Sequence, residues 1–300
     1  MIHNLPKKKH IYKFSADAEP ALEISSGDTV IVETKDCFAD QIQGPEDKLE
    51  NISFDHVNPA TGPIYISGAE KGDALKVTIK EIRIGNQAVM LTGKGLGVLG
   101  HKLEGMHFKV LPVENGEIVF DKQTRITANP MVGVIGVAPE GEAINCGTPD
   151  VHGGNMDTTL IRENAEIYLP VWVEGGLLAL GDLHAAMGDG EVCVSGAEVS
   201  GEVTIEVTLI KGLKLPTPVV VNEEVMAVIC SRETLDDAVV GAVEVMDEII
   251  RNRTDLPQEE VIMLLSIAGQ VRISQVVDPL KTARCEIPLK VLENYDFALV

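Results

Sequence analysis

The chain has 300 residues, of which 45% are hydrophobic, so it is long enough for one large domain or two ordinary ones with a sizeable core. Its 25 Lys and Arg residues against 46 Asp and Glu residues give a formal net charge of −21. Nucleic acids and anionic membranes are bound through basic surfaces, so this acidity argues against both as partners. Neutral or cationic small molecules, metal ions and other protein chains remain as possible binding partners.

The N-terminal two thirds of the sequence predict short strands, because apolar and polar residues alternate between turn signals. In chain order we expect two strands within 9–36, a polar loop over 37–60, and strands at 64–66, 75–80 and 117–121. The glycine-rich segment 93–108 superficially resembles a dinucleotide-binding loop, but it lacks the helix and the following acid that such a loop needs. We expect a mobile loop near the site there.

The middle of the chain combines buried strands with chemically active residues. The apolar run Asn129–Ala138 contains Gly133 and Gly136, which predicts a buried strand whose glycines admit another backbone or a ligand. Segment 145–161 follows and is rich in polar side chains, which fit a binding site and a solvated turn equally well. Further strands are expected at 167–173 and 176–180, joined as a hairpin across Glu174-Gly175, and at 191–195 and 201–210.

The pattern changes after residue 215. Apolar residues at helical spacing predict an amphipathic helix after Ser231, and Pro257 suits the first turn of a second helix. Strands are expected at 223–230, 271–277 and 285–292. We therefore predict a β-rich domain, 1–215, that carries the site and an α+β part, 216–300, packed on the same body, or one single domain 1–300.

The predicted architecture is mainly β, a two-layer β-sandwich or partly closed barrel of many short strands with a helical pair near the C-terminus. The five cysteines are widely spaced without a CxxC pair, which indicates free thiols in a reducing compartment. The N-terminus lacks the apolar core of a signal peptide, and no apolar run approaches the length of a membrane span. We therefore expect a soluble, cytoplasmic protein.

The segment LGDLHAAMGDG, residues 180–190, is the leading candidate for chemistry. Asp182 and His184 are two residues apart, so on a strand both side chains point to the same face. A carboxylate and an imidazole placed in this way can bind one divalent cation. Taken alone, such a pair is more commonly a hydrogen-bonded surface pair, and the cation site depends on further ligands from elsewhere in the chain.

Several long motifs resemble the acetamidase/formamidase family. They are VIVETKDCF (30–38), NPATGPIYISGAEKGDALKV (58–77), HGGNMD (152–157), GDLHAAMGDGEVCVSGAE (181–198) and ISQVVDP (273–279). The resemblance implies a sandwich-type β fold, a homodimer or higher homo-oligomer, and metal-dependent hydrolysis of small aliphatic amides such as formamide or acetamide. It also implies site positions, namely metal ligands at Asp36, Asp182 and His184, and pocket neighbours at Glu33, Asn155, Asp157 and Glu191.

These residue types suit amide hydrolysis. A divalent metal, with Zn²⁺ as the expected ion, polarises the carbonyl and acidifies a bound water, and oxygen-rich acidic clusters would also suit an additional Ca²⁺. A carboxylate must carry the proton to the leaving ammonia, for which Glu33, Asp157 and Glu191 are the catalytic candidates. Asn155 and His152 are the candidates for binding the substrate, because an amide side chain offers both a donor and an acceptor.

Two alternatives remain open from the sequence. Cys37 or Cys146 could act as the nucleophile of a thiol-dependent amidase, although most free cysteines are buried and inert. The chain could also be a metal-stabilised β-sandwich that binds a small ligand without turning it over. Loss of ammonia release on metal removal would separate the metal enzyme from both.

Overall fold

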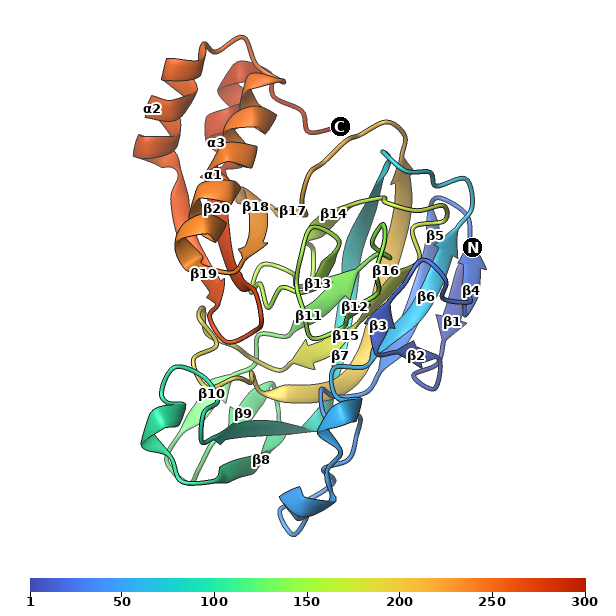
Figure 1. Ribbon diagram of the computed structural model, residues 1–300, viewed down its shortest axis with the longest axis vertical. Helices are drawn as coiled ribbons and strands as arrows, with labels where there is room; N and C mark the ends of the chain where they lie inside the picture. Colours follow the sequence, from blue (N-terminus) through green and yellow to red (C-terminus); the bar gives the residue numbers. More distant parts are fainter.

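The computed structural model describes residues 1–300 apart from the side chain of Asp55, and its fold is mainly β, as the sequence predicts (Figure 1). The strands of the N-terminal part are β1 (Ile2–Leu5), β2 (His10–Ile11), β3 (Lys13–Phe14), β4 (Leu22–Ile24), β5 (Asp28–Thr34), β6 (Ala60–Ile66), β7 (Ala74–Gly93), β8 (Met106–Glu114), β9 (Glu117–Val119), β10 (Arg125–Thr127), β11 (Met131–Gly136), β12 (Ile144–Asn145), β13 (Gly153–Asn155), β14 (Glu166–Pro170), β15 (Leu178–His184) and β16 (Glu198–Ile210). The C-terminal part contains β17 (Val219–Val221), β18 (Val225–Arg232), α1 (Leu235–Arg251), α2 (Gln258–Ala268), β19 (Gln270–Gln275), β20 (Lys281–Pro288) and α3 (Leu289–Leu292).

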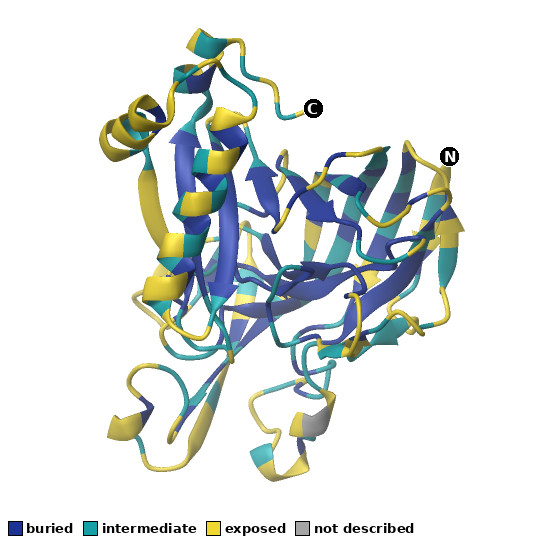
Figure 2. Ribbon diagram, turned by 45° about the horizontal axis from the view of Figure 1, so that its top comes forward, coloured by how far each residue is buried: buried dark blue, intermediate teal, exposed yellow. Residues whose placement is uncertain are grey.

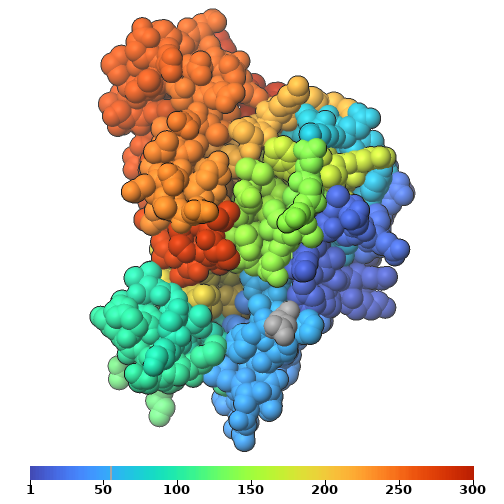
Figure 3. Space-filling model, viewed as in Figure 1, coloured from blue at the N-terminus to red at the C-terminus, as the bar shows by residue number. Residues whose placement is uncertain are grey.

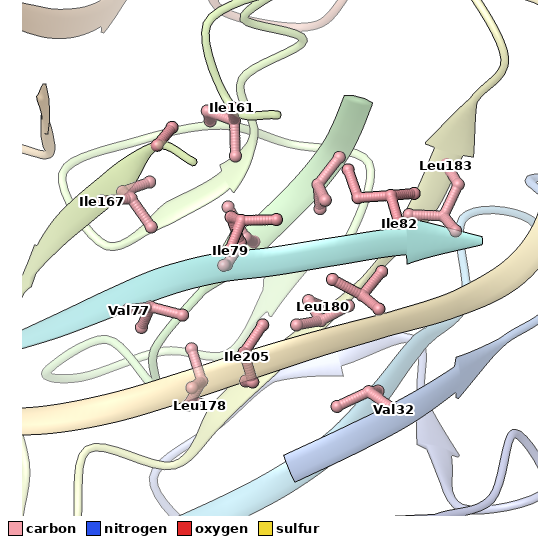
Figure 4. Packing of buried hydrophobic residues seen from close by; sticks show 14 of the residues in the cluster. Val32, Val77, Ile79, Ile82, Ile161, Ile167, Leu178, Leu180, Leu183 and Ile205 are labelled. Carbon is pink, nitrogen blue, oxygen red and sulfur yellow. The ribbon is translucent and has the colours of Figure 1, made fainter. Parts of the chain in front are cut away.

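Two long antiparallel strands, β7 and β16, run through the centre of the body (Figure 1). β5 pairs with the opposite edge of β16, and β14 pairs with β7. Side chains from several strands meet in the main hydrophobic core, where Val77 and Ile79 of β7 lie near Ile205 of β16 and Leu180 of β15 (Figure 4). β15 is buried along its whole length, so its polar residues lie inside the protein.

The C-terminal strands continue this sheet and carry the helices. β17 pairs with β14 on one side and with β18 on the other, and β20 lies between β18 and β19. α1 covers β18 and β20, with its exposed face turned outward (Figure 2). Its N-terminus is capped by Thr234, whose hydroxyl accepts a hydrogen bond from the Asp237 amide at 3.1 Å. The helical pair expected near the C-terminus is confirmed, whereas the division at residue 215 stays a prediction.

Three local expectations are wrong. Residues 167–180 form no hairpin, because β14 pairs with β7 and β17 while β15 pairs with β6, β11 and β16. The intervening segment is a wider turn that includes left-handed backbone at Gly175, Gly176 and Leu177. Segment 191–195 is a turn, not a strand, and the final strand ends at Pro288, where the short helix α3 begins.

The far end of β7 extends beyond the core and pairs with β8, which in turn pairs with β9, and β9 with β10. This region protrudes from one end of the body and forms a separate lobe in Figure 3. In the part of the chain that the structure describes, no helix has the length and apolarity to cross a membrane.

Candidate metal and active site

Strand β15 brings Asp182 and His184 into the interior. Both are buried, and the distance from His184 Nε2 to Asp182 Oδ2 is 3.6 Å. The backbone of Asp182 has a φ of 56°, a left-handed conformation that non-glycine residues adopt rarely, although aspartate does so more readily than most. The two side chains therefore face each other, as their spacing predicts.

Two further carboxylates lie against the same imidazole. His184 Nε2 is 3.2 Å from Glu198 Oε2, at the start of β16, and 3.7 Å from Asp157 Oδ1, just after β13. Gly133 of β11 packs directly against two of these carboxylates. A Cβ at this position would be 2.5 Å from Asp157 Oδ1 and 2.7 Å from Asp182 Oδ2. The glycine thus leaves room for the carboxylates, in agreement with the expectation for the 129–138 strand.

The ligand-type atoms fall into two groups of three residues, and the atoms of each group lie within 4.8 Å of one another. Asp157, His184 and Glu191 form one group, and Cys37, Asp182 and Glu198 form the other. These six residues, together with the half-buried Asp278 from the turn between β19 and β20, whose Oδ2 is buried, are called the acidic cluster below.

The acidic cluster concentrates negative charge in the interior. Burial and the neighbouring carboxylates raise the pKa of Asp157 to about 6 and that of Glu198 to about 8, and they hold the pKa of Glu191 and of Asp278 well above the ordinary range. Burial alone would lower the pKa of His184, but Glu198 and Asp182 reverse this and raise it well above its usual value. The cluster therefore holds protons that a cation would displace.

Several buried polar atoms of the cluster lack a hydrogen-bond partner among the described residues. They are Asp157 Oδ1 and Oδ2, Asp182 Oδ1, His184 Nδ1 and Nε2, Glu198 Oε2 and Asp278 Oδ2. Buried polar groups are nearly always paired, so converging orphaned atoms indicate a missing ligand. Carboxylate oxygens, an imidazole nitrogen and a thiol sulfur are the donors that Zn²⁺ accepts, and the oxygens also suit Ca²⁺. The residues fit a divalent cation.

The two predicted residues of the β5 region lie outside these groups. Asp36 is buried, and one of its carboxylate oxygens accepts a hydrogen bond from the Asp40 amide at 2.8 Å. The neighbouring residue, Cys37, instead places its sulfur near Asp182 and Glu198. Burial raises the pKa of Asp36 to about 6. Glu33 is exposed, because the alternation of β5 turns its neighbours Val32 and Thr34 inward. The structure therefore does not bring Glu33 to the acidic cluster.

The two candidates for substrate binding are buried near Asp157. Asn155 forms a register pair with Val134 of β11, and its Oδ1 has no partner among the described residues. His152 packs edge-on against Phe14 with ring centroids 5.1 Å apart, and burial lowers its pKa to about 4. His152 is thus a neutral ring in an apolar setting, whereas Asn155 retains a free acceptor.

Sequence reasoning missed two members of the acidic cluster, Glu198 and Asp278, and it considered a third, Cys37, only as a nucleophile. Each lies in a motif that carries the family resemblance, at 181–198, 273–279 and 30–38 respectively. Glu198 ends the second of two SGAE sequences, but Glu70, which ends the first, is exposed and paired with Lys211, so the repeat does not single out Glu198. No local pattern points to Asp278, which reaches Asp157 through the fold of the C-terminal strands.

A cavity of about 500 Å³ lies beside the acidic cluster. One wall comes from β7–β10 and the other from segment 186–197, which joins β15 to β16. Glu191 and Gly196 belong to its lining, and a Cβ on Gly196 would be 2.5 Å from His184 Nδ1. The cavity therefore reaches the Glu191 carboxylate, and only the backbone of Gly196 separates it from the His184 ring, which makes it the approach for a small molecule.

Known proteins share both the sequence and the fold. Residues 4–146 and 141–294 match the model of the Acetamidase/Formamidase family. The structure of a recombinant predicted acetamidase/formamidase from Thermoanaerobacter tengcongensis is 54% identical and covers 99% of each chain with a TM-score of 0.98. An acetamidase from Bacillus halodurans is 47% identical, over 97% of this chain and 99% of its own, with a TM-score of 0.95.

Matches to curated relatives are shorter. A formamidase from Methylophilus methylotrophus is 45% identical over 64 residues, which are 21% of this chain and 16% of that enzyme. The chain spans less than two thirds of the length of the curated relatives it matches.

Proposed function

Because the chain belongs to the acetamidase/formamidase family, we propose that it hydrolyses the linear C–N bond of small aliphatic amides, of the formamide and acetamide type, to a carboxylate and ammonia. Relatives named formamidase and acetamidase support this reaction class. The structural observation that carries the proposal is the acidic cluster itself, where His184 Nε2 lies 3.2–3.7 Å from three buried carboxylates beside an open cavity.

We further propose that the acidic cluster holds a divalent metal, with Zn²⁺ on His184, Asp182 and their neighbours, and with room for an additional cation such as Ca²⁺. Bound there, the metal would polarise the amide carbonyl and acidify a water. The support is the set of orphaned buried atoms and the raised pKa values, since unpaired carboxylates in the interior need a compensating charge.

The protein residues then have separable tasks. Glu191 lines the cavity and lies within 4.8 Å of Asp157 and His184, which suits it to take a proton from the attacking water and pass it to the leaving nitrogen. Asp157 is the alternative carrier. Asn155 Oδ1, a free acceptor, can bind the amide NH₂. Glu198 accepts a hydrogen bond from the Gly196 amide at 2.9 Å and is held in place by it.

The structure does not favour a thiol nucleophile. Burial and the charges of Glu198 and Asp182 raise the pKa of the Cys37 thiol well above its usual value, and burial raises that of Cys146 to about 12. Without a cation, a thiolate is therefore suppressed at both positions. With a cation in the cluster, Cys37 is a ligand candidate, because a coordinated thiol is deprotonated.

The decisive experiment combines metal content with ammonia release. We expect chelation to abolish hydrolysis of formamide and acetamide, and zinc to restore it. His184→Ala should lose both zinc, measured by mass spectrometry, and activity, yet keep its circular dichroism spectrum, whereas the exposed His101→Ala should retain both. Activity that survives complete metal removal but is lost in Cys37→Ser would instead establish the thiol mechanism.

A homo-oligomer, at least a dimer, also remains part of the proposal. α2 buries few of its apolar residues, and several large ones are exposed on it and on β19, namely Ile262, Met263, Ile267, Val271 and Ile273. Apolar patches of this kind commonly mark protein–protein interfaces. Light scattering at micromolar concentration would reject the proposal if it gave the mass of a single chain.

A further inference from the structure

The lining of the cavity is mostly apolar. The lobe supplies Leu111 and Ile118, which are buried, and Phe120 and Ile126, which are partly exposed at the rim. The opposite wall, from segment 186–197, adds Ala186, Met187, Val192 and Ala197. Apolar walls with a few polar groups at one end are typical of sites that bind the hydrocarbon part of a ligand.

The polar end of the cavity is the end at the acidic cluster. Glu191 is shared by the cavity and the cluster, and the backbone of Gly196 separates the cavity from the His184 ring. An amide group held at this end would direct its acyl chain along the apolar walls. The charged residues that line the cavity are Asp189, which is paired with Arg284, and Glu191 at the polar end. No basic residue lies along the described apolar walls, so an acyl chain that ends in a carboxylate would find no compensating charge there.

The cavity is far larger than formamide or acetamide needs. Acetamide has four non-hydrogen atoms and takes up roughly the volume of three or four waters, at about 30 Å³ each. The cavity volume is about 500 Å³. Most of that space would remain filled with water against apolar walls if the substrate were so small, which is unfavourable.

Building on the proposed function, we propose that this cavity is an acyl-chain pocket and that the preferred substrates are amides with an uncharged aliphatic chain several carbons long. Formamide and acetamide are then poor substrates that occupy the polar end alone. The apolar walls contributed by the lobe set the chain preference, and Ile126 and Phe120 contact its distal carbons.

A substrate series tests the chain preference in the zinc-loaded enzyme. With formamide, acetamide, butanamide and hexanamide, kcat/KM should rise from acetamide to hexanamide by about fourfold per added methylene, the gain expected for burial of one methylene. A kcat/KM that is flat or falls beyond acetamide would overturn the pocket assignment while leaving amide hydrolysis intact.

A charged side chain at the rim of the cavity tests where the acyl chain lies. Ile126→Asp places a carboxylate beside the distal carbons, so the ratio of kcat/KM for hexanamide to that for formamide should fall by about tenfold or more. Val240→Asp is the matched control, because Val240 is also a partly exposed aliphatic residue but lies on α1, and it should leave the ratio unchanged. An equal ratio in the two variants would reject the proposed position of the chain.

Binding of the product separates this inference from the proposed function. Calorimetry should show hexanoate binding at least tenfold more tightly than acetate, with a negative heat-capacity change that marks apolar burial. If no amide is hydrolysed but hexanoate binds and Ile126→Asp weakens it, the proposed function fails and the pocket stands. If amides are hydrolysed but hexanoate binds no better than acetate, the pocket fails.

Discussion

At the level of single residues, the acidic cluster has room for its carboxylates because residue 133 has no side chain. Gly133 has no left-handed φ, so alanine is compatible with its backbone and the effect of a substitution there is steric. We expect Gly133→Ala to push Asp157 and Asp182 aside and to weaken zinc binding by about tenfold or more, because a metal site tolerates little displacement of its ligands. Titration calorimetry with zinc measures the change.

The matched control is Gly44→Ala, where an added Cβ meets no atom within 4 Å. It should bind zinc as tightly as the unmodified protein. Zinc affinity that is equal in both variants would show that the carboxylates next to Gly133 do not bind the metal.

The same residue scale shows what the sequence could and could not predict about the site. The pairing of Asp182 and His184 could be predicted, because a two-residue spacing on a strand places both side chains on the same face. The sulfur of Cys37, not the carboxylate of Asp36, lies near Asp182 and Glu198, because β5 ends at Thr34 and beyond that point alternation no longer fixes side-chain direction. The position of Asp278 in the cluster could not be predicted, since it depends on pairing between strands far apart in sequence.

At the level of elements, the segment between β15 and β16 carries Glu191 and is anchored to the C-terminal strands. Buried Arg284 of β20 donates two hydrogen bonds to Asp189, at 3.0 and 2.7 Å, and one to Ser274 Oγ at 3.1 Å. The Gly190 amide donates to the Ser274 carbonyl at 2.8 Å. The C-terminal strands thus position the proposed proton carrier as well as supplying Asp278.

Asp189→Ala should therefore both destabilise the protein and impair the reaction. Loss of a bidentate bond to a buried guanidinium costs about 2 kcal/mol in the free energy of unfolding. Urea denaturation measures that cost, and we expect kcat to fall more than KM changes, because Glu191 loses its support. Glu140→Ala, which breaks the exposed pair with Lys71, should cost less than about 0.5 kcal/mol and leave kcat unchanged.

Element prediction from the sequence succeeded where the pattern is local. The amphipathic spacing of α1 and the alternation in β16 reflect the face that each element buries, so both were predictable. The hairpin expected over 167–180 failed because partner choice is a tertiary property. β14 pairs with β7 and β15 pairs with β11, and the sequence of the intervening turn does not indicate these partners.

At the level of the whole molecule, the acidic cluster links the two halves of the chain. Asp157, Asp182 and His184 come from the N-terminal part, whereas Asp278 comes from a turn that belongs to the C-terminal strands. A cation bound among them would stabilise the contact between these parts, because ligand binding to the folded state alone adds to the free energy of unfolding. Without the cation, protons must provide the compensating charge.

This exchange of protons for a cation predicts that the metal-free protein loses stability as the pH rises. In the folded state the pKa of Asp157 is about 6 and that of Glu198 is about 8, against ordinary values of 3.8 and 4.5, and the pKa of His184 is also raised. The folded state therefore binds more protons than the unfolded state, so raising the pH from about 5 to about 8 lowers the free energy of unfolding, by about 1.4 kcal/mol per pH unit for each proton released. Calorimetric melting of the chelated protein should show Tm falling over this pH range, and Tm should fall less steeply in Glu198→Gln. In the zinc-loaded protein Tm should hardly change, because the cation has replaced the protons. A Tm of the chelated protein that rises from pH 5 to pH 8 would mean that the cluster is not the dominant titrating unit.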